Sequence, residues 1–196
     1  MSAIEKTTAA DTIGSALTKV LEAGETASAK GVYHLQCFDK DGNLKWEAEC
    51  PNLVVNVGLQ DMNTKYFTGS SYTAAWYIGL YGAGASNSPA AGDTMSSHAG
   101  WTEVYTQYSQ STRPAVNFTS TPPTAANPSV ATNSGNAAQF SFTTGVTVGG
   151  AFLVSNSTKG GTTGILYSAS DFTTPGDRAV VNGDTLNVTY TLSLAG

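Results

Sequence analysis

One apolar run, residues 74–81, constrains the fold more than any other part of the sequence, and it reads AAWYIGLY. Polar and glycine-rich turn residues precede and follow it. A short run that is apolar on both faces is typical of a strand buried on both sides, although periodicity alone leaves a buried helix open. The bulky Trp76, Tyr77 and Ile78 and the internal Gly79 favour the strand. We therefore predict a central strand that the rest of the chain covers on both faces.

The clearest local pattern is a hairpin over residues 33–50. Apolar and polar residues alternate over 33–38 and again over 44–50, with Asp41-Gly42 between the two runs. An Asp-Gly pair in this setting is typical of a two-residue type I′ turn. That closure places the apolar residues of both strands on one face, so register and pattern agree. The predicted partners are Tyr33 with Cys50, Leu35 with Ala48, Cys37 with Trp46, and, on the outer face, His34 with Glu49.

Cys37 and Cys50 are the only cysteines in the chain. On the hairpin register they lie about four residues apart along the sheet, roughly 13 Å at the usual strand rise. A disulfide requires Cα atoms within about 7 Å. We predict two free, buried thiols, which agrees with a protein made in a reducing cytoplasm.

The rest of the chain after residue 50 shows further short alternating runs separated by turn residues. We expect one short helix at 58–67, with Leu59, Met62 and Tyr66 on its buried side. Residues 82–100 and 120–135 read as long loops, which are usually functional or held by neighbours. The class is mainly β, a single antiparallel sandwich or jelly roll over 31–196 with one or two short helices. The remaining strands are expected at 53–57, 101–108, 114–119 (paired with the strand before it), 138–143, 146–155, 164–170, 178–181 and 185–194.

Residues 1–30 are predicted to form an arm that contains a short amphipathic helix. The first ten residues are small and polar, and Gly24 is placed to end the helix. Its apolar stripe needs a partner, because a helix of this length is marginal alone in water. That partner is either the chain's own sandwich or a neighbouring chain. We predict that the stripe is an assembly interface formed by Ile13, Leu17, Val20 and Leu21.

Charge and composition narrow the classes of partner. Charged residues make up 12% of the chain, about half the usual ~25% share. Either hydroxyl and amide side chains hydrate the surface, or the surface packs against other subunits. The net charge of −5 disfavours a nucleic-acid partner, which would require clustered Lys and Arg. We see no signal-peptide pattern over 1–31 and no apolar run of transmembrane length, so we expect no membrane partner.

Candidate chemical groups are few. The only histidines are His34 and His98, and His98 lies near Asp93 and Ser96 without the G-x-S-x-G pattern that a hydrolase of that type would show. Residues 39–43 begin like a calcium loop, but Leu44 and Cys50 stand where that loop needs glycine and glutamate. We predict no enzymatic activity, no metal and no cofactor.

Seven short segments carry a resemblance to known proteins: GNLKW at 42–46, NLVVNVGL at 52–59, WYIGL at 76–80, GDT at 92–94, GWTE at 100–103, GILY at 164–167 and NGDTL at 182–186. In order and spacing they resemble a family of virion structural proteins from tailed bacteriophages, mostly short-tailed ones. The resemblance covers roughly residues 31–194 and implies a virion protein made in the host cytoplasm, a homo-oligomer that binds the major capsid protein and neighbouring virion subunits. Its implied role is a capsid decoration (cement) protein on the outside of the head; the alternative is a tail, collar or head-fibre component.

A third reading, from a different class, is a carbohydrate-binding module. Trp101, Tyr105 and Tyr108 could stack on sugar rings if they are exposed. The competing interpretation is that these three aromatics belong to the core of the sandwich.

Overall fold

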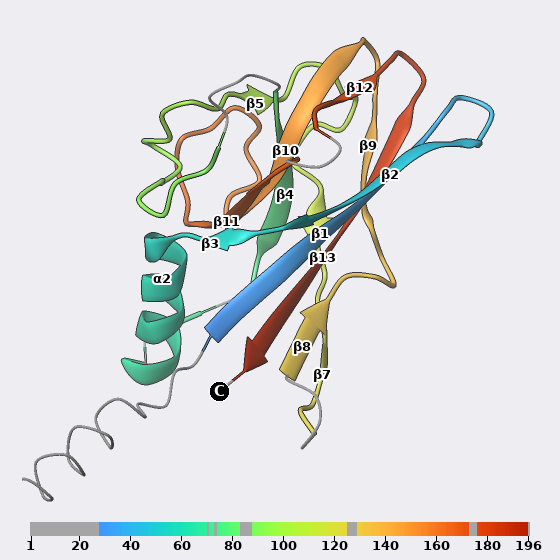
Figure 1. The fold of residues 1–196 in the computed structure, drawn as a ribbon. Coiled ribbons are helices and arrows are strands. Elements are labelled where there is room, and N and C mark those ends of the chain that lie inside the picture. Colours follow the sequence, from blue (N-terminus) through green and yellow to red (C-terminus); the bar gives the residue numbers. More distant parts are fainter. Residues whose placement is uncertain are drawn as a thin grey trace, which may run out of the picture. The chain divides into compact units, whose positions relative to one another are not determined.

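The computed structural model describes residues 28–69, 71–72, 74–82, 88–124, 129–172 and 176–195. Residues 29–194 form one compact unit, made of two antiparallel sheets and one helix (Figure 1). This confirms the predicted mainly β, two-sheet class. The jelly-roll variant stays a prediction, as does the arm over residues 1–30. Ile13, Leu17, Val20 and Leu21 lie outside the described residues.

The first sheet has the strand order β2-β1-β13-β8-β7, with β9 paired to the early part of β13. The long strands β1 and β13 lie side by side at its centre, and β1 begins at the end of the sheet where β13 finishes (Figure 1). Its strands are β1 (Ser28–Phe38), β2 (Leu44–Pro51), β7 (Thr119–Thr121), β8 (Ser129–Thr132), β9 (Ala138–Ser141) and β13 (Thr185–Ala195).

The second sheet has the order β3-β11-β10-β4-β5, with β12 paired to β10 and β6 paired to β4. The helix α2 (Asn56–Phe67) follows β3 and lies against β11. The strands are β3 (Leu53–Val54), β4 (Trp76–Gly82), β5 (Glu103–Val104), β6 (Ala115–Val116), β10 (Val146–Val154), β11 (Leu166–Asp171) and β12 (Arg178–Val180).

The second sheet is buried on both faces, which explains the sequence of the predicted central strand. Ile78 and Leu80 of β4 point into the main core between the two sheets. Tyr81 points to the opposite face, into a second core with Trp101 and other apolar side chains. Described residues of the loop predicted over 82–100 supply part of that second core, so this loop covers a sheet face.

Two glycine–aromatic pairs bring β4 and β10 together. Tyr81 pairs with Gly150, and Gly79 pairs with Phe152. A Cβ atom built on Gly150 would lie 2.0 Å from the Tyr81 ring, and one on Gly79 would lie 2.1 Å from the Phe152 ring. Each ring occupies the space that a side chain on its partner would need, so the close approach of the ring requires glycine at both positions.

The hairpin has the predicted register but a different turn. Tyr33 pairs with Cys50 and Cys37 with Trp46, as expected, but Phe38 pairs with Leu44. Asp39 N also donates to Asn43 O (2.9 Å) and Gly42 N to Asp39 O (3.0 Å), so the loop consists of the three residues 40–42, of which only Gly42 has positive φ. A type I′ turn needs positive φ at both central residues, so that prediction was wrong.

An extra residue in β2 restores the register. Lys45 lies between the Phe38–Leu44 and Cys37–Trp46 pairs and has no opposite residue. Such a bulge redirects a side chain, and the Lys45 ammonium reaches the buried carboxylate of Asp184. A three-residue loop and a one-residue bulge together give residues 46–50 the faces that a two-residue turn would have given, but Leu44, expected on the inner face, is 51% exposed.

Other predicted elements differ in extent. The strand expected at 101–108 is only Glu103–Val104, and the segment expected to pair with it forms β6 on β4 instead. The strand at 53–57 is only β3, because α2 begins at Asn56. The linker predicted over 120–135 contributes β8 and most of β7. The five strands from residue 138 onward lie close to their predicted bounds.

Candidate functional site

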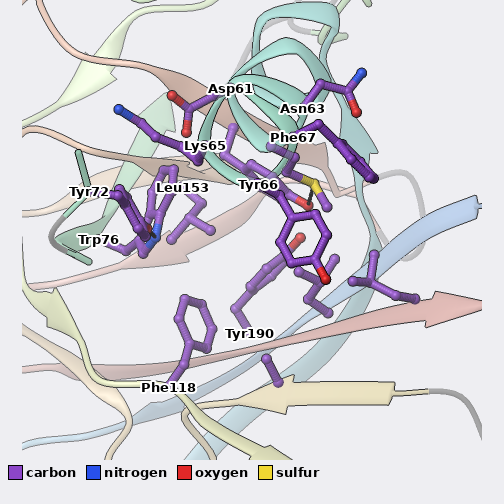
Figure 2. A pocket seen from close by; sticks show the side chains of 15 residues that line it. Asp61, Asn63, Lys65, Tyr66, Phe67, Tyr72, Trp76, Phe118, Leu153 and Tyr190 are labelled. Carbon is purple, nitrogen blue, oxygen red and sulfur yellow. Dashed lines mark hydrogen bonds between the residues drawn. The ribbon is translucent and has the colours of Figure 1, made fainter. Parts of the chain in front are cut away.

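An apolar groove lies between the C-terminal half of α2 and the two sheets (Figure 2). Its volume is about 460 Å³. The side chains that line the groove come from α2, from both sheets and from the segments between strands, and nearly half of them are aromatic. The lining residues are Asp61, Met62, Asn63, Lys65, Tyr66, Phe67, Tyr72, Trp76, Phe118, Ala131, Leu153, Tyr167, Tyr190, Leu192 and Leu194.

The N-terminal half of α2 is fixed to β11 at close range. Gly58 is the buried residue of the helix, and a Cβ there would lie 2.5 Å from the Tyr167 carbonyl oxygen. Val55 N donates to that same carbonyl (3.1 Å), and the Tyr167 hydroxyl donates to the Met62 sulfur (3.1 Å). These contacts set the angle at which the rest of the helix passes over the groove.

The C-terminal half of α2 presents two aromatic side chains to solvent. Tyr66 is 83% exposed and Phe67 is 77% exposed, and their rings pack edge to face at 4.9 Å. Tyr66 extends over the cavity towards Tyr190, with Phe118 on the opposite wall (Figure 2). The prediction that Leu59 and Tyr66 face the interior was wrong, whereas Met62 does pack against the core.

The floor of the groove is the end of the main core. Tyr190 of β13 is fully buried and packs against Tyr33 at a ring distance of 4.6 Å. Its hydroxyl accepts a hydrogen bond from Asn52 Nδ2 (2.7 Å). Burial raises the pKa of this hydroxyl, so it stays neutral at physiological pH. Phe118 packs against the same ring, 6.0 Å away.

One wall combines Trp76 with a tyrosine that precedes β4. Trp76 Nε1 donates to the Tyr72 hydroxyl (2.7 Å), and the Trp76 ring packs edge to face on Tyr167 (5.6 Å). Lys65 lies over the Tyr72 ring at 5.6 Å and donates to Ser71 O. The polar groups of this wall are satisfied by one another, so the wall offers mainly ring faces to an occupant.

The sequence did contain a signal for this site. Tyr66, Phe67, Tyr72 and Trp76 are four aromatics within eleven residues, on both sides of a polar turn. Helical periodicity assigned Tyr66 to the buried side because it follows Met62 by one turn. What periodicity could not supply is that α2 docks through Gly58, which rotates the helix and exposes its last turn.

The histidines have structural partners. His34 pairs across the hairpin with Glu49 in backbone register, but its ring contacts Glu47, the diagonal neighbour. That contact lowers the pKa of the Glu47 carboxyl. His98 stacks on the Trp101 indole (3.8 Å), and its Nδ1 donates to the Trp101 carbonyl (3.0 Å). Asp93 accepts from Trp101 Nε1 (3.0 Å), so the indole lies between the two groups that a triad would join.

The calcium-like run at 39–43 is a turn stabilised from within. Asp39 Oδ1 accepts from the backbone N–H groups of Asp41 and Asn43, both at 2.9 Å. Hydrogen bonds from Asn43 are the main reason that the pKa of the Asp39 carboxyl is lowered. Among the described residues no group of three or more His, Cys, Asp or Glu side chains is placed to hold a metal ion.

A buried ion pair joins the loops beside β5. Arg113 is 0% exposed, and its guanidinium donates to both carboxylate oxygens of Glu103 (2.8 and 2.7 Å). The same guanidinium donates to the carbonyls of Asn156 and Gly161. Gly160 N donates to Glu103 Oε2 (2.8 Å). With its hydrogen bonds made inside the protein, this pair fixes loops and is not offered to a ligand.

Two of the three aromatics considered for sugar stacking are in the core. Trp101 and Tyr108 are each 3% exposed. Tyr105 is partly exposed, but Gly160 packs near its ring. These positions do not form an aromatic platform for a sugar.

Comparison with known proteins adds no family to this picture: no family model matches the chain, and no similar curated protein or solved structure was found. No described helix is long and apolar enough to cross a membrane.

Proposed function

We propose that this chain is a structural subunit of a phage virion, a decoration protein that binds the outside of the head and stabilises the shell. The observation that carries the proposal is the exposed aromatic groove beside α2, which is suited to docking and not to catalysis. That the docking takes place in a phage particle is inferred from the sequence resemblance.

An exposed apolar surface of this kind marks an interaction site in a soluble protein. Tyr66 and Phe67 leave large ring surfaces in water, and burial of an aromatic side chain contributes strongly to association. The chain also has few charged residues, so little charge would have to be desolvated when subunits pack. A protein that binds the assembled shell in this way stabilises it by mass action.

The test uses full-length protein and particles of the encoding phage that lack it. Added protein should co-sediment with these particles to saturation, at on the order of hundreds of copies per particle, as a lattice-wide site requires. The variant Tyr66→Ser/Phe67→Ser should bind more weakly by about tenfold or more. Tyr105→Ser is the matched control, because Tyr105 is 41% exposed and lies off the groove.

Three results would contradict the proposal. Absence of saturable binding would remove the virion role, and a glycan-array signal that depends on Tyr66 and Phe67 would replace it with carbohydrate binding. Saturation at about a dozen copies or fewer would assign the chain to the tail or collar of the particle instead, where symmetric rings are small.

A further inference from the structure

We propose that the aromatic groove binds the amphipathic segment 11–23 of a neighbouring copy of this chain. The inference rests on the proposed function, because it takes the groove to be a docking surface used in assembly. It names the occupant of that surface.

The walls of the groove favour a helix as the occupant. Trp76 Nε1, the Tyr190 hydroxyl and the Tyr167 hydroxyl already have partners within the protein. An extended peptide would bring backbone N–H and C=O groups that need partners, and such walls supply few. A helix satisfies its backbone internally and enters a groove with apolar side chains one turn apart.

The chain's own sequence contains a stripe of that spacing. Ile13, Leu17, Val20 and Leu21 fall at positions i, i+4, i+7 and i+8 of the segment, which is one face of a helix. A helix of this length gains most of its stability from packing. The segment therefore needs an apolar surface, and the groove is an apolar surface without an occupant among the described residues.

The tether sets the range of the contact. Leu21 precedes Ser28, the first residue of β1, by seven residues, which span at most about 25 Å when extended. β1 begins where β13 finishes (Figure 1), and Leu192 and Leu194 of β13 line the groove. A copy packed near this end of a sandwich places its stripe within reach of the neighbour's groove.

A contact between copies does what the proposed function requires. Exchange of an identical element between protomers is a low-cost route to association. Every copy carries both the stripe and the groove, so contact between copies requires no additional surface. On a shell the neighbouring grooves are held close together, which raises their effective concentration for the tethered segment. The same apolar burial then links subunits across the lattice.

The experiment compares four full-length proteins by sedimentation velocity over a range of concentrations: wild type, Leu17→Glu in the stripe, Leu194→Glu in the groove, and Leu44→Glu as the matched control. Leu194 and Leu44 are both exposed leucines near strand ends, and Leu44 is not in the groove. We expect wild type to self-associate and Leu44→Glu to behave like wild type. Leu17→Glu and Leu194→Glu should each associate at least about tenfold more weakly than wild type. Thermal melting of each variant checks that it is folded.

Mixing the two defective variants separates a contact between copies from one within a copy. Leu17→Glu retains an intact groove and Leu194→Glu retains an intact stripe, so an equal mixture should recover a 1:1 dimer at a concentration where neither variant associates alone. A wild type that stays monomeric at every concentration overturns the inference, as does a mixture that fails to recover. A small apolar molecule retained by the folded protein in native mass spectrometry would identify a different occupant and also overturn it.

Failure here is distinguishable from failure of the proposed function. The mixing experiment uses purified protein without particles. A monomeric protein that still saturates the phage head would contradict only this inference, and a self-associating protein that ignores the head would contradict only the virion role.

Discussion

Two basic side chains of this protein, Arg113 and Lys159, tie loops together. The chain has only three basic residues beyond Tyr66: Arg113, Lys159 and Arg178. Lys159 donates to the carbonyls of Tyr108 and Gln110 and lies 3.9 Å from the centre of the Tyr108 ring. Together with the Arg113–Glu103 pair, it holds the loop after β10 against the segment after β5. Charged residues are rare in this sequence, and two of these three basic residues, Arg113 and Lys159, hold long connections that lack regular secondary structure.

Replacing Arg113 by Met should destabilise the protein by about 3–5 kcal/mol, because it leaves the Glu103 carboxylate buried without its ionic partner. Chemical denaturation of the full chain measures this. The double variant Arg113→Met/Glu103→Leu should recover part of the loss, since no unpaired charge remains. Lys40→Met is the control: Lys40 pairs with Asp41 on the surface, so its loss should cost less than about 1 kcal/mol. A loss of less than about 1 kcal/mol for Arg113→Met would contradict the assignment.

Buried thiols and phenols should make the protein sensitive to alkaline pH. Burial raises the pKa of Cys37 to about 12 and that of Cys50 to about 11, and it raises the pKa of Tyr33 and Tyr81 well above their usual range. A group whose pKa is higher in the folded state contributes stability that is complete below its unfolded pKa. That stability is lost as pH rises towards the folded pKa. These four groups therefore act in the same direction above about pH 9.

The measurement is the free energy of unfolding between pH 8 and pH 11. Above about pH 9 and up to its folded pKa, each thiol should add a decline that approaches about 1.4 kcal/mol per pH unit. The variant Cys37→Ala/Cys50→Ala should decline less steeply, whatever its stability at pH 8. Burial lowers the pKa of Lys159, which acts in the opposite sense, but it raises the pKa of Tyr108, Tyr167 and Tyr190, which add to the effect of the other four groups. A flat profile in the parent protein would contradict the burial of both thiols, which are free in the structure.

At the scale of elements, the hairpin shows how a correct pattern can hide a wrong turn. The alternation over 33–50 predicted the inward residues correctly except for Leu44, which is exposed, because a one-residue slip would place apolar side chains in water. It could not predict the three-residue loop, since the Lys45 bulge cancels the difference in register. The short strands β5 to β8 were the least predictable elements, because two to four residues carry too little periodicity. The groove was missed for a related reason: a docking glycine, Gly58, fixes the rotation of α2.

The β4–β10 pairing should be intolerant of a single added methyl group. Gly150→Ala should destabilise the protein by about 1–3 kcal/mol, because the new Cβ meets the Tyr81 ring and the Ser170 carbonyl oxygen. Gly145→Ala is the matched control: the nearest atom to its Cβ would be 3.5 Å away, an ordinary contact. Thermal unfolding compares the two variants. Equal stabilities would show that the cross-strand packing has more room than the structure indicates.

At the scale of the whole molecule, the aromatic groove beside α2 differs from the rest of the structure in the exposure of its aromatic side chains. The main core and the second core bury the aromatic side chains of β4, β10 and β13. The aromatics around the end of α2 remain in water. The two-sheet class followed from the order of short runs, whereas the groove depends on side chains from segments far apart in sequence, which no local pattern brings together.

Hydroxyl-radical footprinting of intact particles and of dilute free protein tests most directly whether this groove is a docking surface. Tyr66, Phe67 and Tyr72 are exposed in the structure and should be oxidised readily in the free protein. In the particle their oxidation should fall by about tenfold or more, as expected for side chains in the water-excluded centre of an interface. Tyr105, partly exposed and off the groove, should change little. Equal oxidation of Tyr66 and Phe67 in both states would contradict the account.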